Sequence, residues 1–200
     1  ILRHCEDSSN GVRKSALWAL GEFRCSEHYP VFEKALSDSD FMVRSAAFDA
    51  IGKLPGIPNE DEFVELLNSD DYEVRAGVIK KLADENVKIP VNSLVKVIKD
   101  HYESVREAAI DYIIAENDED NIPLAIIVLG DETKKIAKKA YTWLEPRVEQ
   151  ILPVMVEKLD GEGRFTRELA ARMLGKSKNK SVIAPIGEAL KATRSATFAK

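Results

Sequence analysis

The chain has 200 residues, of which 44% are hydrophobic and 32% charged, and its formal net charge is −5. Such a composition can fill a core, and no run approaches the roughly 20 apolar residues of a membrane helix, so no membrane association is expected. The acidic balance disfavours nucleic acid as a partner. Two cysteines exclude a disulfide framework and fit a reducing compartment, which predicts a cytoplasmic protein.

The sequence contains an internal repeat with a period of 31 residues. A Val-Arg pair recurs at this spacing, as Val12-Arg13, Val43-Arg44, Val74-Arg75 and Val105-Arg106. The next step reaches Ile136-Ala137, and a step of 30 residues then reaches Thr166-Arg167. A second apolar set keeps the same period: Cys5, Leu36, Leu67, Ile98, Leu129, Leu159 and Leu190. Two independent sets with one period indicate a repeat architecture.

Each repeat predicts two helices, because apolar residues at offsets 0, 4 and 8 from the Val fall on one helical stripe. We call the helix that contains the Val helix B and the shorter one before it helix A. In chain order, starting with a helix B and alternating, the predicted helices cover residues 10–23, 27–37, 41–53, 60–68, 72–84, 92–100, 103–115, 120–130, 134–144, 147–159, 164–175 and 180–193.

Residues at the predicted helix ends agree with these limits. Side-chain oxygens that can cap helix B stand three residues before the Val position, at Ser9, Asp40, Asp71 and Thr133. Glycines typical of helix C-caps follow the last aliphatic residue of three B helices, at Gly21, Gly52 and Gly175.

One helical pair cannot bury its own apolar face, so the repeats are expected to stack into an all-α solenoid. We count about six and a half repeats. Ile1–Cys5 looks like the end of a helix A, and the last helix A has no complete partner. We therefore expect residues 1–200 to form a single array that is a fragment, truncated at both ends.

One repeat carries a motif that resembles a known family. The pattern Asp-x-Asp-x-x-Val-Arg-x-x-Ala-x-x-Ala-Ile-Gly is present as Asp38-Ser39-Asp40-Phe41-Met42-Val43-Arg44, followed by Ala47, Ala50, Ile51 and Gly52. It is similar to the HEAT-like repeats of the PBS-lyase type. The resemblance implies a right-handed α-α superhelix in which the B helices line the concave face. Most relatives are binding scaffolds, and others are chromophore lyases, di-iron hydroxylases or DNA glycosylases.

The repeated arginines have two interpretations. They form a ladder of Arg13, Arg44, Arg75, Arg106 and Arg167. An anion track would be a functional role. The favoured interpretation is structural, because the resemblance implies that each Arg bonds an acidic residue in an inter-repeat turn, and guanidinium–carboxylate geometry suits such a bond. The expected acceptors are Asp7, Asp38, Asp70, Asp71 and Asp100.

Motifs for metal or catalytic chemistry are weak. No His is followed by Glu, which counts against a di-iron site, and Cys25-x-x-His28 has a zinc-like spacing without a converging second pair. Cys5 lies at a core position and is interpreted as a small buried hydrophobe. The acidic run at residues 117–121 lacks the pattern of a calcium loop. We expect no metal, no cofactor and no enzymatic activity.

Charge and surface patterning point instead to partner binding. Residues 1–130 contain 14 Lys+Arg and 25 Asp+Glu (14 − 25 = −11), whereas residues 131–200 contain 15 and 9 (15 − 9 = +6). Such polarity suits a partner with its own charge gradient, or head-to-tail self-association. Positions expected to project from helix B vary between repeats, and those chosen for the partner-binding face are Lys14, Trp18, Asp49, Lys53, Lys80, Asp84, Glu107, Asp111, Lys138, Thr142, Arg172 and Lys176.

The sequence therefore predicts a non-enzymatic scaffold that binds a protein or peptide on its concave face. The alternatives are an accessory or maturation factor related to chromophore lyases, and a HEAT-like nucleic-acid-binding or repair protein. Exposed Trp18 is a candidate interface anchor or a packing residue, while Trp143 is interpreted as packing. A change of curvature is predicted near residues 130–165, where Ala137 replaces the ladder Arg and four lysines crowd one helix.

Overall fold

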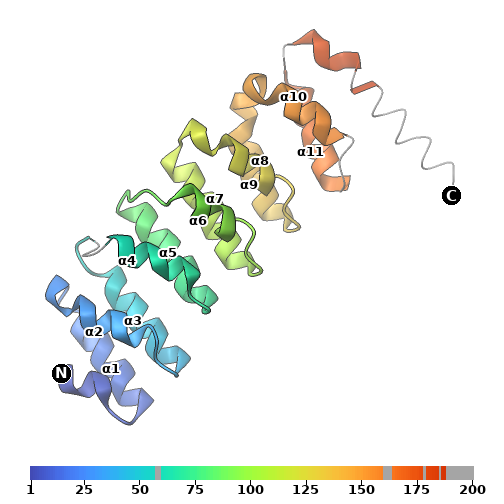
Figure 1. Cartoon of the computed structure of the whole chain (residues 1–200). Coiled ribbons are helices and arrows are strands. Elements are labelled where there is room, and N and C mark those ends of the chain that lie inside the picture. The colour runs from blue at the N-terminus through green and yellow to red at the C-terminus, as the bar shows by residue number, and fades with distance from the viewer. Residues whose placement is uncertain (57–59, 160–163, 178, 185, 188–200) are drawn as a thin grey trace, which may run out of the picture. The chain divides into compact units, whose positions relative to one another are not determined.

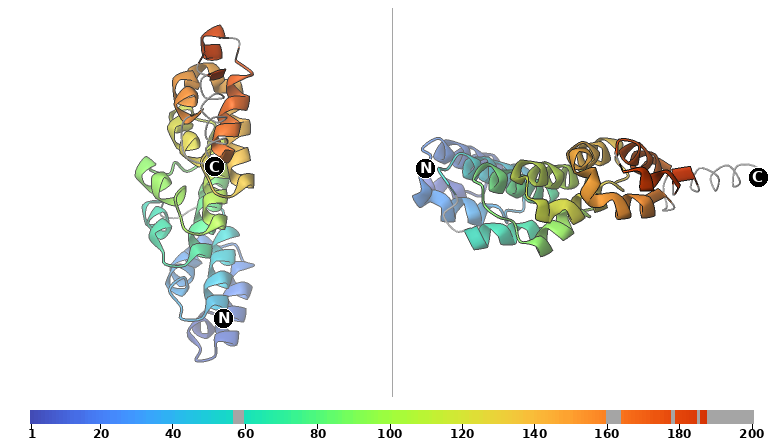
Figure 2. Two further views of the ribbon diagram at one scale, coloured as in Figure 1. Left: turned by 90° about the vertical axis from the view of Figure 1, so that its right-hand side faces the viewer. Right: turned by 90° about the horizontal axis from the view of Figure 1, so that it is seen from above.

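The computed structural model describes residues 1–56, 60–159, 164–177, 179–184 and 186–187, and within these ranges it is helical without strands. Figures 1 and 2 draw the described parts as coiled ribbons joined by turns. The chain divides into two compact units, Ile1–Tyr112 and Ile113–Lys200. In the described ranges no helix has both the length and the apolar character that crossing a membrane requires.

The first unit alternates B and A helices, as the sequence predicts. Its α-helices are α1 (Asn10–Gly21), α2 (Tyr29–Ala35), α3 (Phe41–Gly52), α4 (Glu60–Glu65), α5 (Tyr72–Asp84), α6 (Val91–Val97) and most of α7 (Glu103–Glu116). Short 3-10 helices lie before α1, before α2 and after α4: η1 (Leu2–Glu6), η2 (Ser26–His28) and η3 (Leu66–Asn68). Within this unit α1 packs on α3 and α3 on α5, and Figure 1 shows these B helices side by side.

The second unit continues the alternation after the last turn of α7. Its elements are η4 (Glu119–Asn121), α8 (Ile122–Val128), α9 (Lys134–Leu144), η5 (Glu145–Arg147), α10 (Val148–Leu159), α11 (Arg164–Leu174) and η6 (Lys180–Val182). Here α8 packs on α9, α9 on α11 and α10 on α11. The predicted helix at 180–193 begins as η6, and its part beyond residue 187, like Leu190, lies outside the described residues.

The repeat periodicity corresponds to the core. Every described member of the 31-residue apolar set from Cys5 to Leu159 is buried. The last aliphatic positions of the B helices are buried as well: Leu20, Ile51, Leu82, Ile113, Leu144 and Leu174. Burying one such side chain contributes roughly 1.5–3 kcal/mol, so the stacked helices, not any single pair, hold the fold together.

The predicted caps are correct in part. The Asp40 carboxylate accepts from the backbone N–H groups of Met42 and Val43, and Asp71 accepts from that of Glu73. Ser9 makes no capping bond through its side chain, and the Gly11 N–H donates instead to Asn10 Oδ1 at 2.8 Å. Thr133 caps no backbone group of α9 through its side chain.

The glycine prediction is wrong for Gly21 and Gly52, which form the last residue of α1 and α3 and are followed by right-handed backbone. Gly21 is needed for packing instead, since a Cβ there would lie 2.8 Å from Ala50 Cβ and 2.9 Å from Ala50 Cα. Nothing lies within 4 Å of the corresponding position at Gly52. Left-handed backbone occurs at other residues, among them Asn86 and Asn117.

Candidate partner-binding face

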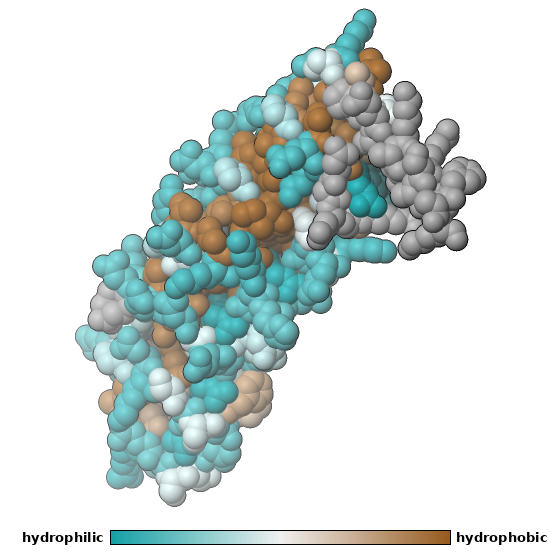
Figure 3. Space-filling model, turned by 45° about the vertical axis from the view of Figure 1, so that its right-hand side comes forward, coloured by the Kyte–Doolittle hydropathy of each residue, from teal (hydrophilic) through white to brown (hydrophobic). Residues whose placement is uncertain are grey.

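The predicted partner-binding residues lie on or just after the B helices, and all but two are exposed. Lys53 and Glu107 are half-buried. Eight of the twelve belong to the first unit, and Lys138, Thr142, Arg172 and Lys176 belong to the second. On the face drawn in Figure 3, apolar side chains form patches between hydrophilic ones. Polar and apolar groups are thus both available for contact on the outside of the molecule.

One contact joins the face across neighbouring repeats of the first unit. Trp18 on α1 is 57% exposed, and Lys53 Nζ at the end of α3 lies 5.6 Å from the centroid of its ring. The same ammonium donates to Glu22 Oε1 at 2.6 Å. Phe23, which the repeat pattern does not single out, lies two residues beyond the end of α1 and is 64% exposed. Two large aromatic side chains therefore face solvent at one end of α1.

In the second unit the selected residues bond mainly to near neighbours. Arg172 donates to Glu168 Oε1 at 2.7 Å, one turn earlier on α11. Lys176 follows the end of α11 and forms an ion pair with Glu145 of the preceding repeat. Thr142 Oγ1 donates to the Lys138 carbonyl at 3.0 Å within α9.

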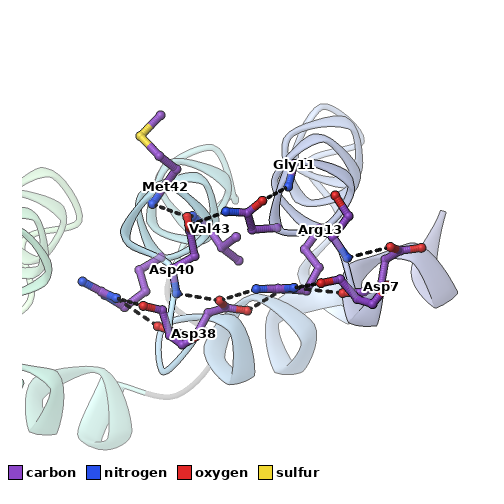
Figure 4. A network of polar contacts seen from close by, with 12 residues as sticks. Asp7, Gly11, Arg13, Asp38, Asp40, Met42 and Val43 are labelled. Carbon is purple, nitrogen blue, oxygen red and sulfur yellow. Dashed lines mark hydrogen bonds and ion pairs between the residues drawn. The ribbon is translucent and has the colours of Figure 1, made fainter.

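The repeated arginines bond to the turns between helices A and B. Arg13 donates from Nε and Nη2 to both carboxylate oxygens of Asp38, at 2.8 and 2.7 Å. Its Nη1 donates to the Asp7 and Ser8 carbonyls, at 2.9 and 3.2 Å, in the turn before its own helix. Figure 4 shows this arrangement, in which Arg13 lies between Asp7 and Asp38.

Two later arginines repeat the pattern. Arg44 donates to Asp71 Oδ2 at 2.7 Å. Arg75 binds both oxygens of Asp100, at 2.7 and 2.8 Å. Asp7 and Asp70, which were also expected to accept through carboxylates, contribute main-chain carbonyls. The Asp7 carboxylate instead accepts from Ser9 N–H at 2.9 Å.

Arg106 is buried, and its Nη1 donates to the carbonyls of Asp100 and His101, at 2.9 and 3.1 Å. The guanidinium groups of Arg13, Arg44 and Arg75 are thus engaged on both sides. This use of their donors supports a structural role and leaves little capacity for an anion track.

Each bound aspartate is more acidic than usual. The hydrogen bond from Arg13 is the largest influence on Asp38 and lowers its pKa below the usual 3.8. For Asp71 and Asp100 the largest single influence is burial, which by itself would raise the pKa. The hydrogen bonds from Arg44 and Arg75, together with those from backbone N–H groups, outweigh burial, so the net pKa of each carboxyl is lowered. These carboxylates are therefore ionised at neutral pH.

A groove of about 540 Å³ lies in the second unit between the last turn of α7 and helix α9. It is lined by Ile114, Lys135, Lys138, Lys139, Thr142, Trp143, Pro146 and Arg147. Lys138 and Thr142 belong to the predicted partner-binding face. Trp143 is 7% exposed, as its interpretation as a packing residue requires, and it also contributes to this groove.

A network at one end of the groove fixes Trp143. Arg147 stacks on its indole, with 4.1 Å between the guanidinium carbon and the ring centroid. Arg147 Nη1 donates to the Trp143 carbonyl, and Nη2 to Asn117 Oδ1, both at 2.7 Å. Trp143 Nε1 donates to the same oxygen at 3.1 Å. No sequence motif marks Arg147 or Asn117, because their role depends on how the turn after α7 approaches η5.

Among the described residues, no three His, Cys, Asp or Glu side chains cluster closely enough to hold a metal ion. Cys5 is buried, and burial raises the pKa of its thiol. Cys25 is half-buried and forms no disulfide. A buried thiol with a raised pKa is a poor nucleophile, which agrees with the packing role predicted for Cys5.

The comparisons with known proteins concern the fold. The chain is 21% identical to a protein in the complex of CpcE and CpcF of phycocyanin lyase from Nostoc sp. PCC7120, with a TM-score of 0.58 over 87% of this chain and 74% of that one. An engineered protein is 18% identical, with a TM-score of 0.47 over 94% and 95% of the two chains. None of the curated proteins matches the sequence. The family model for HEAT repeats matches residues 1–62 and 60–144, and the chain therefore belongs to the HEAT repeat family.

Proposed function

We propose that the chain is a non-enzymatic scaffold that binds a protein or peptide partner through the exposed side of its B helices. The observation that carries this proposal is the contrast between two sets of positions in the same helices. The sixth residue after the Val position is Trp18, Asp49, Lys80, Asp111, Thr142 or Arg172, and all six are exposed. The eighth residue is aliphatic and buried in each repeat, as Leu20 and Ile51 illustrate.

The core positions are alike in every repeat and the outer positions differ, so the residues that stabilise the fold are not the ones available to bind a partner. Repeats that share a scaffold can each present a different side chain without a change in packing. Trp18 supports a binding role further, since a largely exposed Trp is a common anchor of protein interfaces. A cytoplasmic location is part of the proposal, since two cysteines in 200 residues suit a reducing compartment.

Quantitative affinity capture with surface variants tests the proposal. Trp18→Ala and Lys80→Glu change exposed B-helix positions in the first unit. Val91→Ala and Lys99→Glu are the matched controls, because both residues are exposed and lie on or beside the A helix α6. We expect Trp18→Ala to reduce recovery of a bound partner by roughly tenfold or more. The controls should recover it at the wild-type level.

The opposite pattern would reject the assigned face. If only the α6 variants lose the partner, recognition belongs to the A-helix side. If all four variants recover the same proteins in the same amounts, neither face has the proposed role. Circular dichroism on each variant establishes that the helices are intact before the comparison is made.

A further inference from the structure

The groove between the end of α7 and helix α9 has an apolar floor and a cationic rim. Ile114, Trp143 and Pro146 supply apolar surface, while Lys135, Lys138, Lys139 and Arg147 bring positive groups to its edge. No carboxylate is among the residues that line it in the described part of the chain. Its volume of about 540 Å³ lies within the range of roughly 300–1,000 Å³ typical of ligand sites.

We propose that this groove binds an acidic peptide that presents one apolar side chain between carboxylates. The inference rests on the proposed function, since it assigns a class of partner to one part of the B-helix side. The apolar side chain would enter beside Ile114 and Pro146. A flanking carboxylate would meet the exposed ammonium of Lys138 on α9.

The positive rim follows from helix geometry. Residues three and four apart share one side of a helix, so Lys135, Lys138, Lys139 and Thr142 fall on one side of α9. Lys135 and Lys139 have other interactions within the protein. Lys138 is exposed at the groove and is the residue on which the electrostatic part of the proposal depends. The aliphatic stems of these lysines extend the apolar surface while their ammonium groups reach solvent.

The floor is held in place before any partner arrives. The Trp143 indole is covered by the Arg147 guanidinium and donates to Asn117 Oδ1. Arg147 itself is held by the Trp143 carbonyl and by Asn117. A fixed wall lowers the entropic cost of binding, because the side chains that form it lose little further freedom.

The composition of the groove selects this partner class over other anions. A nucleic acid or an anionic membrane would need cations spread over a longer surface and would gain little from an apolar floor. A second copy of the chain could also bring acidic residues, from residues 1–130, to this rim. The lining of one apolar pocket by several cations favours a short peptide with a single anchor.

Fluorescence anisotropy with a labelled synthetic peptide tests the assignment. The probe carries one Phe flanked by Glu and Asp, and two matched peptides replace either the Phe by Ser or the flanks by Lys. We expect the first peptide alone to bind at low ionic strength and to weaken as salt is added. Lys138→Glu should reduce its affinity by about fivefold or more.

Lys99→Glu is the matched control, because Lys99 lies beside α6 and outside the partner-binding face, is exposed and undergoes the same charge change. It should leave the affinity unchanged. Equal loss with both variants would show a general charge effect and overturn the proposal. Equal binding of the Ser peptide, or no binding of the Phe peptide, would also overturn it.

Two further measurements identify other occupants. The first measures binding of phosphatidylserine–phosphatidylcholine vesicles and of single-stranded DNA to the wild type. If Lys138→Glu lowers the affinity for either of these more than it lowers the affinity for the peptide, the groove is reassigned to polyanions. Sedimentation that shows self-association lost in Lys138→Glu would reassign it to a second copy. If Trp18→Ala still abolishes partner capture while the acidic peptide fails to bind, this inference falls and the scaffold function stands.

Discussion

Arg75 and Asp100 form a bidentate ion pair between successive repeats of the first unit. Arg75 Nε and Nη2 donate to the two carboxylate oxygens, at 2.7 and 2.8 Å, and the two side chains are only 12% and 11% exposed. The remaining Nη1 donates to the Ser69 and Asp70 carbonyls, at 2.7 and 3.1 Å. One guanidinium therefore ties the turn before α5 to the turn before α7.

Removing Arg75 should destabilise the first unit. We expect Arg75→Ala to lower the free energy of unfolding by about 2–4 kcal/mol, because the largely buried Asp100 carboxylate loses its ion pair and the Ser69 and Asp70 carbonyls lose a donor. Urea unfolding followed by circular dichroism measures the change, and exposed Lys99→Ala serves as the control. A loss below about 0.5 kcal/mol, the usual effect of a surface change, would contradict the structural role of this arginine.

Acid should weaken the same ties. The pKa values of Asp38, Asp71 and Asp100 are lowered in the folded protein, so these carboxyls bind fewer protons folded than unfolded. Their stabilising contribution is complete above the usual pKa of 3.8 and is lost as the pH falls through the lower folded values. Asp38→Asn should therefore be less stable than wild type at pH 7, with the difference shrinking toward acid. A difference that stays constant as the pH falls would refute the linkage.

The two glycines that end α1 and α3 should respond oppositely to alanine. Gly21→Ala places a methyl group 2.8 Å from Ala50 Cβ and should lower the free energy of unfolding by about 1–3 kcal/mol. Gly52→Ala meets nothing within 4 Å and should raise it by up to about 1 kcal/mol through helix propensity. Thermal unfolding of both variants decides the matter. Equal effects would show that Gly21 is not required for the close approach of these helices.

The sequence was sufficient for features that depend on periodicity. Burial of Leu36, Leu67 and Ile98 follows from the 31-residue spacing, because every repeat must bury the same stripe. Features that depend on how two segments approach one another were not predictable. Gly21 looked like a cap and proved to be a packing residue, and buried Lys81 was missed although its Nζ donates to the Leu54 carbonyl and to Glu85, at 3.0 and 2.7 Å.

The candidate site divides in the same way. Outward positions such as Lys138 and Thr142 follow from helical geometry and are exposed as expected. The apolar floor beside them does not follow from one helix, since Ile114 comes from α7 and Pro146 from the turn after α9. The repeat pattern does not predict which partner binds these surfaces, because that choice depends on the partner's chemistry as well.

Asn117 should make two separable contributions to the stability of the second unit, one through its backbone conformation and one through its side chain. Its backbone is left-handed, with φ at 52°, and its side-chain oxygen accepts from both Trp143 and Arg147. Asn117→Gly keeps the backbone conformation accessible and removes the hydrogen bonds, at a cost of about 1–3 kcal/mol. Asn117→Ala adds roughly 1 kcal/mol for the left-handed conformation. Denaturant unfolding that finds the two variants equally stable would contradict a strained backbone at this position.

The last prediction concerns a joint near residues 130–165. Ala137 on α9 is fully buried where the earlier repeats carry Arg44 or Arg75, so the bidentate tie between turns is absent at this repeat. Among the described residues, the Glu145–Lys176 ion pair joins this repeat to the next, and its lysine is 59% exposed, so solvent screens the pair and it stabilises the interface only weakly.

A weak interface in a repeat array lets neighbouring blocks open separately, because each repeat is stabilised by its neighbours. We therefore expect amide hydrogens of α9 and α10 to exchange faster than those of α5 and the start of α7. Restoring the guanidinium by Ala137→Arg would overpack a buried position, so Lys176→Ala is the better perturbation. It should speed exchange in α9 and leave α5 unchanged. Uniform protection from α7 to α11 in the wild-type chain would show that no such joint exists.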